Sequence, residues 1–238
     1  MQKNLIEIAR DLARKADILS FNPPVTHVYN PLIYAWPSHA LYLKKYGGGR
    51  KEILLLGMNP GPWGMVQTGV PFGDVAMVRD WLNIEEEVNF PRNTHPRRPV
   101  KGFFCGRNEV SGKRLWGWAR DRFGDPDNFF QRFFVANYCP LCFLEESGRN
   151  RTPDRLPKDE REPLLAICDR ALYCTVKLLG PRLVIGIGRF AAERASASLK
   201  ELPVAIGGVT HPSPANPRAN RGWTDLLEDE LAGLGIQL

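Results

Sequence analysis

Hydrophobic residues along this chain fall either into short continuous runs or into longer stretches where they recur every three or four positions. The continuous runs are typical of buried strands and predict four of them, at residues 53–56, 133–136, 183–187 and 204–209. Stretches with helical spacing lie before, between and after these runs, at residues 4–19, 75–82, 112–122, 160–179, 190–199 and 223–234. Prolines interrupt residues 21–37, and a further short helical pattern then ends at Tyr46. Strands that alternate with helices predict an α/β fold with a central four-stranded, mainly parallel sheet and helices on both faces.

Polar residues follow three of the four predicted strands at their carboxyl ends. These residues are Asn59, Asn137 and His211. In open α/β sheets, ligands bind beyond the carboxyl ends of the strands. We therefore expect these side chains, which are far apart in the sequence, to converge at one rim of the sheet and to form a reaction site.

Two loops rich in glycine and proline carry much of this candidate site. They cover residues 57–74 and 211–217. Glycine and proline fix backbone paths that a regular element cannot take, so Asn59 and His211 are expected to be displayed rigidly. Phe72 lies between a proline and a glycine, where an aromatic ring can stack on a flat ligand. Each residue also has a structural interpretation: Asn59 as a turn residue, His211 as a loop histidine and Phe72 as part of the core.

Length and composition predict the number of domains, and the net charge indicates the kind of binding partner. The 238 residues, 43% of them hydrophobic, predict one globular domain over residues 1–238. Lysine and arginine outnumber aspartate and glutamate by 32 to 26, and the net charge of +6 favours a polyanionic partner. Basic residues cluster in loops at residues 92–101, 148–161 and 218–221. These loops are candidates for a phosphate-binding surface, although charged loops are usually only solvated.

Five cysteines bear on redox state and on metals. The N-terminal residues are interrupted by charge at once, so no signal peptide is expected, and reduced cysteines in a cytosolic setting fit best. Cys139 and Cys142 have the spacing of a metal or redox pair, but no second pair accompanies them, so a buried structural role is favoured. No hydrophobic run approaches the roughly 18 residues that a membrane span needs.

Motifs for other chemistries are missing from the sequence. It has no Walker loop and no strand-coupled G-x-G-x-x-G motif, and Gly186-Ile187-Gly188 is too short to count as one. Ser213 lies near His211, but no serine elbow surrounds it. Phosphate-loop enzymes and serine hydrolases are therefore disfavoured.

Two motifs, GMNPGPWGM at residues 57–65 and HPSP at residues 211–214, point to a known family. Together they resemble the single-strand-selective monofunctional uracil-DNA glycosylases, a branch of the uracil-DNA glycosylase superfamily. Further matches occur in order along the chain, namely VYNP (28–31), MVRDWL (77–82), RPV (98–100), SGKR (111–114), NYCPL (137–141), SGRN (147–150) and ANRGW (219–223). The resemblance covers most of the chain and implies a uracil-DNA glycosylase-like fold.

The resemblance also implies roles for single residues. Asn59 is similar to the residue that positions the attacking water, and His211 to the donor that stabilises charge on O2 of the leaving base. Asn137 resembles the amide that reads uracil, and Phe72 the stacking platform. The backbone and walls of the base pocket are implied to come from Met58 and Gly61.

A second set of residues is implied to contact DNA. It comprises Arg149, Asn150, Arg151, Lys158, Pro214, Asn216, Arg218 and Arg221. The segment of residues 212–221 resembles a wedge that fills the gap left by an extruded base. The chain departs from the family at Ala215, where members carry a basic residue, and Arg218 is a candidate to compensate.

These implications add up to a specific expected function. The protein is expected to flip uracil, and 5-substituted uracils such as 5-hydroxymethyluracil, out of single- and double-stranded DNA and to hydrolyse the N-glycosidic bond, leaving an abasic site for base excision repair. The predicted site loops hold no lysine for a Schiff base, so no lyase step is expected. Neither a metal nor another cofactor is implied, and the protein is expected to be a monomer, cytoplasmic or nucleoid-associated in a bacterium and nuclear in a eukaryote.

Three finer expectations concern the site itself. Asn137 can discriminate uracil from cytosine only if its amide does not rotate, so a neighbouring group is expected to hold it. Asn59 has no basicity, so a slower reaction is expected than in relatives with aspartate there. Gly61 leaves space beside C5 of the base, although a turn glycine is its structural interpretation. Two alternative functions are a catalytically silent DNA- or nucleotide-binding module and a hydrolase of free nucleosides.

Overall fold

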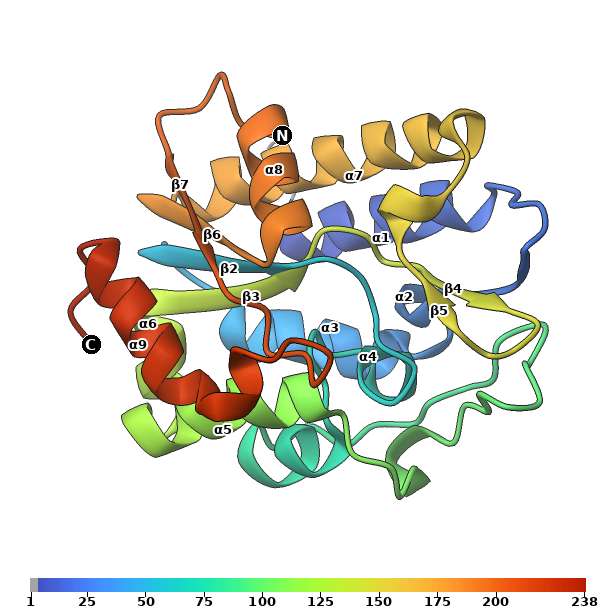
Figure 1. Cartoon of the computed structure of the whole chain (residues 1–238), viewed down its shortest axis with the longest axis horizontal. Coiled ribbons are helices and arrows are strands. Elements are labelled where there is room, and N and C mark those ends of the chain that lie inside the picture. The colour runs from blue at the N-terminus through green and yellow to red at the C-terminus, as the bar shows by residue number, and fades with distance from the viewer. Residues whose placement is uncertain (1–3) are drawn as a thin grey trace.

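A computed structural model describes residues 4–238 of the chain (Figure 1). Residues 1–3, part of the N-terminal segment on which the absence of a signal peptide was argued, lie outside the described residues. The central sheet contains β2 (Ile53–Gly57), β3 (Phe133–Asn137), β6 (Leu183–Ile187) and β7 (Ala205–Val209). Their order is β3-β2-β6-β7, and all three pairings are parallel. All four predicted strands are therefore confirmed, with ends that differ by at most one residue.

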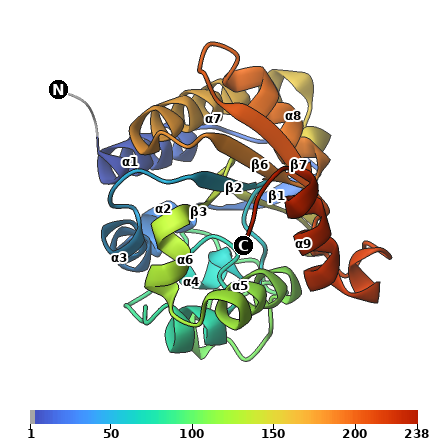
Figure 2. The same ribbon diagram turned by 90° about the vertical axis from the view of Figure 1, so that its left-hand side faces the viewer.

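Helices cover both faces of this sheet (Figure 2). One face carries α7 (Lys158–Leu179) and α8 (Arg189–Ser198), with α1 (Leu5–Asp17) packed beside α7. The other face carries α3 (Trp36–Tyr46), α5 (Val110–Phe123) and α6 (Pro126–Arg132), while α9 (Trp223–Gly233) lies near β7. These layers explain why β2 and β6, the two inner strands, are buried along their whole length.

The ends of the first helix follow from its sequence. Asn4 caps α1, because its side chain accepts from the Glu7 N–H (3.0 Å) while the Glu7 carboxylate accepts from the Asn4 N–H (2.9 Å). This reciprocal pair satisfies two N–H groups that the first turn would otherwise leave unpaired. The apolar face of α1 is buried through Leu5, Ile8 and Ala16.

A second, smaller sheet was not predicted. It joins β1 (Val25–Tyr29), β4 (Cys142–Glu145) and β5 (Asn150–Arg151) in antiparallel pairs. β1 lies in the proline-interrupted segment and contains Thr26 and His27, and β4 and β5 have only four and two residues, so no continuous apolar run indicates these strands. The sheet fixes the basic loop around residue 150 close to the carboxyl ends of the central strands (Figure 1).

Other short elements also differ from the prediction. The helix expected at residues 75–82 is present from residue 75 to 81, but most of it, Met77–Trp81, is π-helical. The short helices α2 (Pro31–Tyr34) and α4 (Met65–Thr68) and the helix α6 were not predicted. None of the helices within residues 4–238 combines the length and apolar character needed to cross a membrane.

Candidate active site

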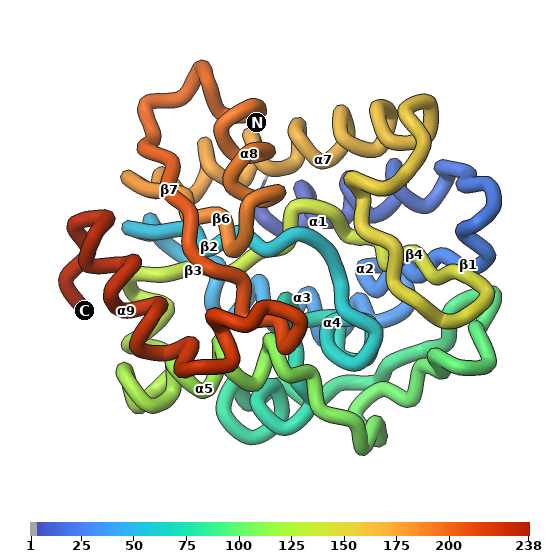
Figure 3. Tube along the Cα trace, viewed as in Figure 1, coloured from blue at the N-terminus to red at the C-terminus, as the bar shows by residue number. Residues whose placement is uncertain are grey.

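The predicted polar residues meet at one rim of the central sheet. The carboxyl ends of β2 and β3 pair through Gly57 and Asn137, and the Tyr138 N–H continues the pairing by donating to the Gly57 carbonyl (2.9 Å). The loops after β2 and β7 approach each other near α4 (Figure 3). Asn59, Asn137 and His211 line one pocket of about 310 Å³, so the predicted convergence is confirmed. The complete lining consists of Met58, Asn59, Gly61, Met65, Phe72, Glu109, Ser111, Asn137, Asn150, Thr152, His211 and Ser213.

The last residue of β2 leaves room for the two side chains that lie over it. A Cβ atom on Gly57 would collide with the Asn137 side-chain oxygen and would lie 2.6 Å from Cε2 of Phe72. Real Cβ contacts are essentially never that short. Gly57 is therefore required for the amide and the ring to sit side by side in the pocket.

Phe72 reaches this position through an unusual backbone conformation. Its φ of 53° lies in the left-handed region, which is rare for a residue with a large side chain. The Phe72 carbonyl accepts from the Asp74 N–H (2.8 Å), and it lies so close to Gly112 of α5 that a Cβ there would collide with it. The helix thus holds the strained turn, which directs the aromatic ring toward the pocket.

Asn137 has a weak but specific neighbour. Its side-chain N–H donates to the Met65 sulfur atom at 3.2 Å. A neighbouring group was expected to fix the Asn137 amide, and this group is the Met65 thioether, which accepts hydrogen bonds only weakly. Met65 is a residue that the sequence interpretation did not single out.

His211 is held in a defined tautomer. Its Nδ1 accepts a hydrogen bond from the Ser213 N–H (3.1 Å), so in the neutral ring the proton is on Nε2. Burial lowers the pKa of His211 to about 4. The Phe72 and His211 rings lie 6.2 Å apart, inclined by 38°. The imidazole is therefore a neutral donor at the edge of an aromatic platform.

Asn59 is oriented by the segment that follows β3. Its side-chain N–H donates to the Leu141 carbonyl at 3.1 Å. With the nitrogen engaged there, the side-chain oxygen of this pocket-lining residue is left to accept a hydrogen bond. Such an oxygen can orient a water molecule through one of its hydrogens.

Glu109 lines the pocket but was missed in the sequence. It is the residue that caps α5, and burial raises the pKa of its carboxyl group, with a smaller contribution from Asp74. A Cβ on Gly61 would lie 2.6 Å from Glu109 Oε2, and one on Gly64 would lie 2.8 Å from Glu109 Cγ. We expected Gly61 to leave open space. On its Cβ side the structure instead places the Glu109 carboxyl group.

Part of the expected DNA-contacting set borders the pocket. Asn150 lines the pocket itself, and a second hollow beside it, of about 440 Å³, shares Asn150 and Thr152 with it. Arg149, Arg151 and Arg155 also line this second hollow. Its guanidinium groups make it a suitable surface for an anion, although Glu145 lies there as well, paired with Arg151 at 3.0 Å.

The residues of the expected DNA-contacting set differ in their exposure and in their ion pairs. Arg149, Pro214 and Arg221 are exposed, as is Ala215 at the position where the family carries a basic residue. Asn216 is partly buried, and its side chain donates to the His211 carbonyl (3.5 Å). Two exposed cations form ion pairs, Lys158 with Glu162 (3.6 Å) and Arg218 with Glu230 (3.5 Å). Arg218 is therefore engaged on α9 in this state.

The loop of residues 211–217 is braced from α5. Arg114 donates to the Pro212 carbonyl (2.8 Å) and to the side-chain oxygen of Asn220 (3.0 Å). Asn220 in turn donates to the Pro214 carbonyl (2.8 Å). Arg114 thus fixes the loop that carries His211, a role that its place in the sequence did not indicate.

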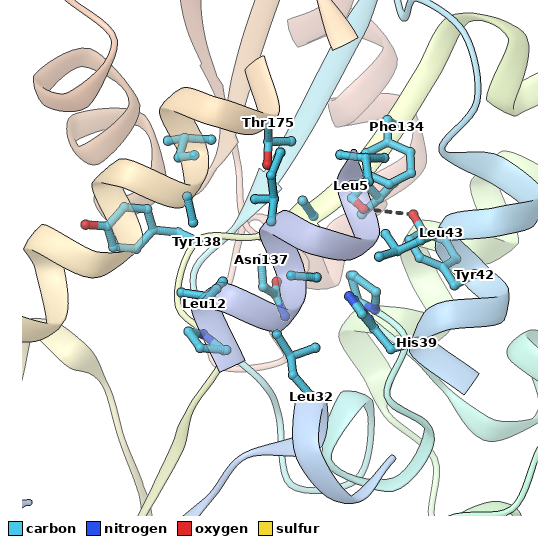
Figure 4. Close-up of a pocket in the computed structure, with 18 of the residues that line it drawn as sticks. Leu5, Leu12, Leu32, His39, Tyr42, Leu43, Phe134, Asn137, Tyr138 and Thr175 are labelled. Carbon is cyan, nitrogen blue, oxygen red and sulfur yellow. Dashed lines mark hydrogen bonds between the residues drawn. The ribbon is translucent and has the colours of Figure 1, made fainter. Parts of the chain in front are cut away.

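A separate apolar cavity of about 80 Å³ lies behind the site (Figure 4). Its walls come from α1, α3, α7 and β3, as the labelled Leu12, Tyr42 and Phe134 illustrate. Asn137 and Met65 line both this cavity and the pocket. The cavity offers few polar partners, so it is not the reaction site. Asn137 is therefore held mainly by Met65 and by its packing over Gly57.

Four of the five cysteines are buried, and Cys174 is partly exposed. Burial raises the pKa of the Cys142 and Cys168 thiols, and a raised pKa makes a thiol unreactive. Cys139 and Cys142 are both buried and free. Within residues 4–238 no group of three or more His, Cys, Asp and Glu side chains is arranged to hold a metal ion.

The sequence of this chain matches a known protein family. The model of that family, the Uracil DNA glycosylase superfamily, matches residues 44–229. This chain belongs to the uracil DNA glycosylase superfamily. The resemblance drawn from the sequence motifs is thereby confirmed.

Relatives in this superfamily include two mammalian proteins. The chain is 52% identical over 220 residues to the single-strand selective monofunctional uracil-DNA glycosylase of Rattus norvegicus, a match that covers 92% of this chain and 79% of the relative. It is 50% identical to the Bos taurus protein of the same description, with 92% and 81% covered. Among solved structures, the wild-type SMUG2 protein of Pedobacter heparinus matches with a TM-score of 0.66 at 18% identity, covering 96% of this chain and 97% of that one. The structural match confirms the predicted fold.

In this member of the superfamily, the six residues expected to form the catalytic and base-binding site all line one pocket. They are Met58, Asn59, Gly61, Phe72, Asn137 and His211. The site therefore offers an aromatic platform, two oriented amides and a neutral imidazole donor. Such a set can bind a flat ring with polar edges and stabilise negative charge on one of them.

Proposed function

We propose that this chain is a monofunctional DNA repair glycosylase that extrudes uracil from DNA and hydrolyses its N-glycosidic bond, leaving an abasic site. Membership of the uracil DNA glycosylase superfamily supports the reaction class. The observation that carries the finer proposal is the meeting of Asn59, Asn137 and His211 around the Phe72 ring. We further propose that it acts as a single domain and a monomer, cytoplasmic or nucleoid-associated in a bacterium and nuclear in a eukaryote.

Base recognition falls to Asn137 in this proposal. A base inside a duplex has to leave the stack before its glycosidic bond is accessible, at a cost of a few kcal/mol. Once the base lies on Phe72, the Asn137 amide accepts from uracil N3–H and donates to O4. Cytosine presents the opposite pattern and would leave buried polar groups unpaired, which can discriminate by about 10⁴ to 10⁵.

His211 and Asn59 divide the chemistry between them. As the glycosidic bond breaks, the sugar gains oxocarbenium character and the uracil leaving group gains negative charge on O2. The Nε2–H of His211 donates to that oxygen. Asn59, anchored to Leu141, orients the attacking water without deprotonating it, which agrees with a slower reaction than an aspartate would give.

DNA binding is assigned to the loops around the pocket. The hollow lined by Arg149, Arg151 and Arg155 is suited to phosphate groups of the strand. The braced loop with Pro214 at its tip is suited to fill the gap left by the extruded base. Both single- and double-stranded DNA are proposed substrates, because flipping is needed only in a duplex while the pocket reads the base alone.

The proposal extends to uracils substituted at C5. Gly61 lies at the pocket wall assigned to the C5 edge, where the Glu109 carboxyl group fills the space on its Cβ side and offers a polar partner to a substituent that can donate a hydrogen bond. 5-Hydroxymethyluracil is therefore a proposed substrate beside uracil itself.

A substrate panel at one fixed salt concentration tests the proposed function. It contains single-stranded oligonucleotides with one uracil or one cytosine, the uracil duplex, and free uridine. We expect release of free uracil from both uracil-containing DNAs, an intact abasic strand, and no hydrolysis of cytosine or uridine. Binding without release would instead indicate a silent binding module, and hydrolysis of uridine with little salt dependence would indicate a nucleoside hydrolase.

The pH dependence should show whether His211 acts in its neutral form. Because burial lowers its pKa from 6.5 to about 4, the ring stays neutral from about pH 5 upward. We expect a single-turnover rate of uracil release that shows no step near pH 6.5 and falls as the pH drops toward 4. A rate that increases as the pH falls through 6.5 would show that the imidazolium ion is the donor and would contradict this assignment.

A further inference from the structure

Glu109 is the one carboxylate among the pocket-lining side chains of the described residues. It comes from the start of α5, about fifty positions along the chain from the loop it packs against. Its side chain lies across two glycines of that loop, with Oε2 beside Gly61 and Cγ beside Gly64. A side chain on either glycine would displace it. The two glycines therefore make room for this carboxyl group at the pocket wall.

The two oxygens of Glu109 have different surroundings. Oε1 accepts from the Ser111 N–H at 3.4 Å, which ties it to the first turn of α5. The Glu109 N–H donates to the Asp74 carboxylate at 2.9 Å, and the same carboxylate accepts from the Met77 N–H at 3.3 Å. Oε2, by contrast, receives no backbone N–H within residues 4–238 and lies next to Gly61, while the Ser111 side chain also bonds to the carboxyl group. One oxygen is thus anchored, and the other is available to a ligand in the pocket.

A carboxyl group in this position carries a cost. Burial raises the pKa of Glu109, which means that the charged form is disfavoured by the loss of water around it. An apolar side chain of similar length would fill the same space without that cost. Capping of α5 through the Ser111 N–H uses Oε1, so Oε2 at the pocket wall is the oxygen left for an interaction with a ligand.

We propose that Glu109 is a specificity-determining residue that reads the substituent at C5 of the base, a role that rests on the proposed function. Gly61 forms the wall at the C5 edge, and Glu109 Oε2 occupies the space that a side chain of Gly61 would take. The hydroxyl of a 5-hydroxymethyl group donates a hydrogen bond to this oxygen. The methyl group of thymine cannot donate, and it would bury the carboxyl oxygen without a partner. Glu109 thus favours 5-hydroxymethyluracil and rejects thymine.

The test compares three bases within each enzyme variant. Single-stranded oligonucleotides that differ only in carrying uracil, 5-hydroxymethyluracil or thymine are cleaved under single-turnover conditions. The variants are the full-length wild type, Glu109→Met, which keeps the length but removes both oxygens, and Glu109→Gln, which keeps an acceptor for Ser111. Glu193→Gln on α8, an exposed glutamate, serves as the control. Ratios of rates within one variant cancel differences in the amount of folded protein.

In Glu109→Met we expect the rate on 5-hydroxymethyluracil relative to uracil to fall about tenfold, the size of one hydrogen bond to a charged group. We expect the rate on thymine relative to uracil to increase in the same variant. Glu109→Gln is expected to lie between Glu109→Met and the wild type, and Glu193→Gln to match the wild type.

Three results would count against the proposal in distinguishable ways. Unchanged ratios in both Glu109 variants would overturn it. Equal losses on uracil and 5-hydroxymethyluracil would also overturn it, and would indicate that Glu109 acts on the water or the sugar instead. If the wild type releases uracil from none of its DNA substrates, the proposed function itself fails.

Discussion

Replacing His211 with leucine is expected to slow uracil release by about 10² to 10³, the usual cost of losing one preorganised donor to a developing anion. The donor is preorganised because the Ser213 N–H occupies Nδ1 and thereby leaves the proton on Nε2. Leucine fills a similar volume but offers no hydrogen to O2 of the leaving base. Single-turnover release of uracil from a single-stranded oligonucleotide measures the effect. Binding of the same DNA should change much less, because the donor acts mainly in the transition state.

A matched variant separates lost chemistry from a disturbed loop. Leucine also removes the acceptor for Ser213, so the loop of residues 211–217 could shift. Ser213→Ala keeps the Ser213 N–H and the His211 ring, and it removes only the side-chain oxygen that accepts from the Ala215 N–H (3.1 Å). Its rate should stay within a few-fold of the wild type. A His211→Leu enzyme that is as fast as Ser213→Ala would show that the imidazole is not the donor.

The central sheet could be predicted from the sequence because its two inner strands, β2 and β6, are buried along their whole length and its edge strands are also mainly apolar. Each of them is a continuous apolar run, and parallel pairing places their carboxyl ends at one rim. The parallel arrangement was therefore sufficient to predict that Asn59, Asn137 and His211 lie close together. The antiparallel sheet was missed because polar residues interrupt β1, and because β1 and β4 pair between segments more than a hundred residues apart.

The groups around the catalytic side chains could not be predicted in the same way. Met65, Glu109 and Arg114 act through contacts with loops that are distant in the sequence. Nothing in the local pattern distinguishes Glu109 from the other helix-capping residues, since its contact with Gly61 depends on how α5 crosses the loop. Glycines gave the best available signal, because Gly57, Gly61 and Gly64 each mark a place where another side chain lies against the backbone.

Gly57→Ala is expected to slow uracil release strongly, because the added methyl group would enter the space between the proposed base-reading amide and the aromatic ring. The new Cβ would collide with the Asn137 side-chain oxygen and lie 2.6 Å from the Phe72 ring. Gly57 is the last residue of a buried central strand, so the backbone has little freedom to move away. The amide and the ring must shift instead, which disturbs base reading and stacking together. We expect uracil release to fall by at least about 10², and stability to fall by about 1 to 3 kcal/mol as in other overpacked cores.

Gly117→Ala provides the matched control, because a Cβ there meets no atom within 4 Å. Gly117 lies in the middle of α5, where alanine favours the helix by up to about 1 kcal/mol. This variant should therefore release uracil at the wild-type rate and unfold at an equal or higher temperature. Rates are measured at a temperature where circular dichroism shows both variants folded, so that lost stability is not read as lost activity. A folded Gly57→Ala enzyme with the wild-type rate and unchanged rejection of cytosine would contradict the proposal. Asn137 and Phe72 would then have been displaced without loss of function, so they could not form the base-reading wall.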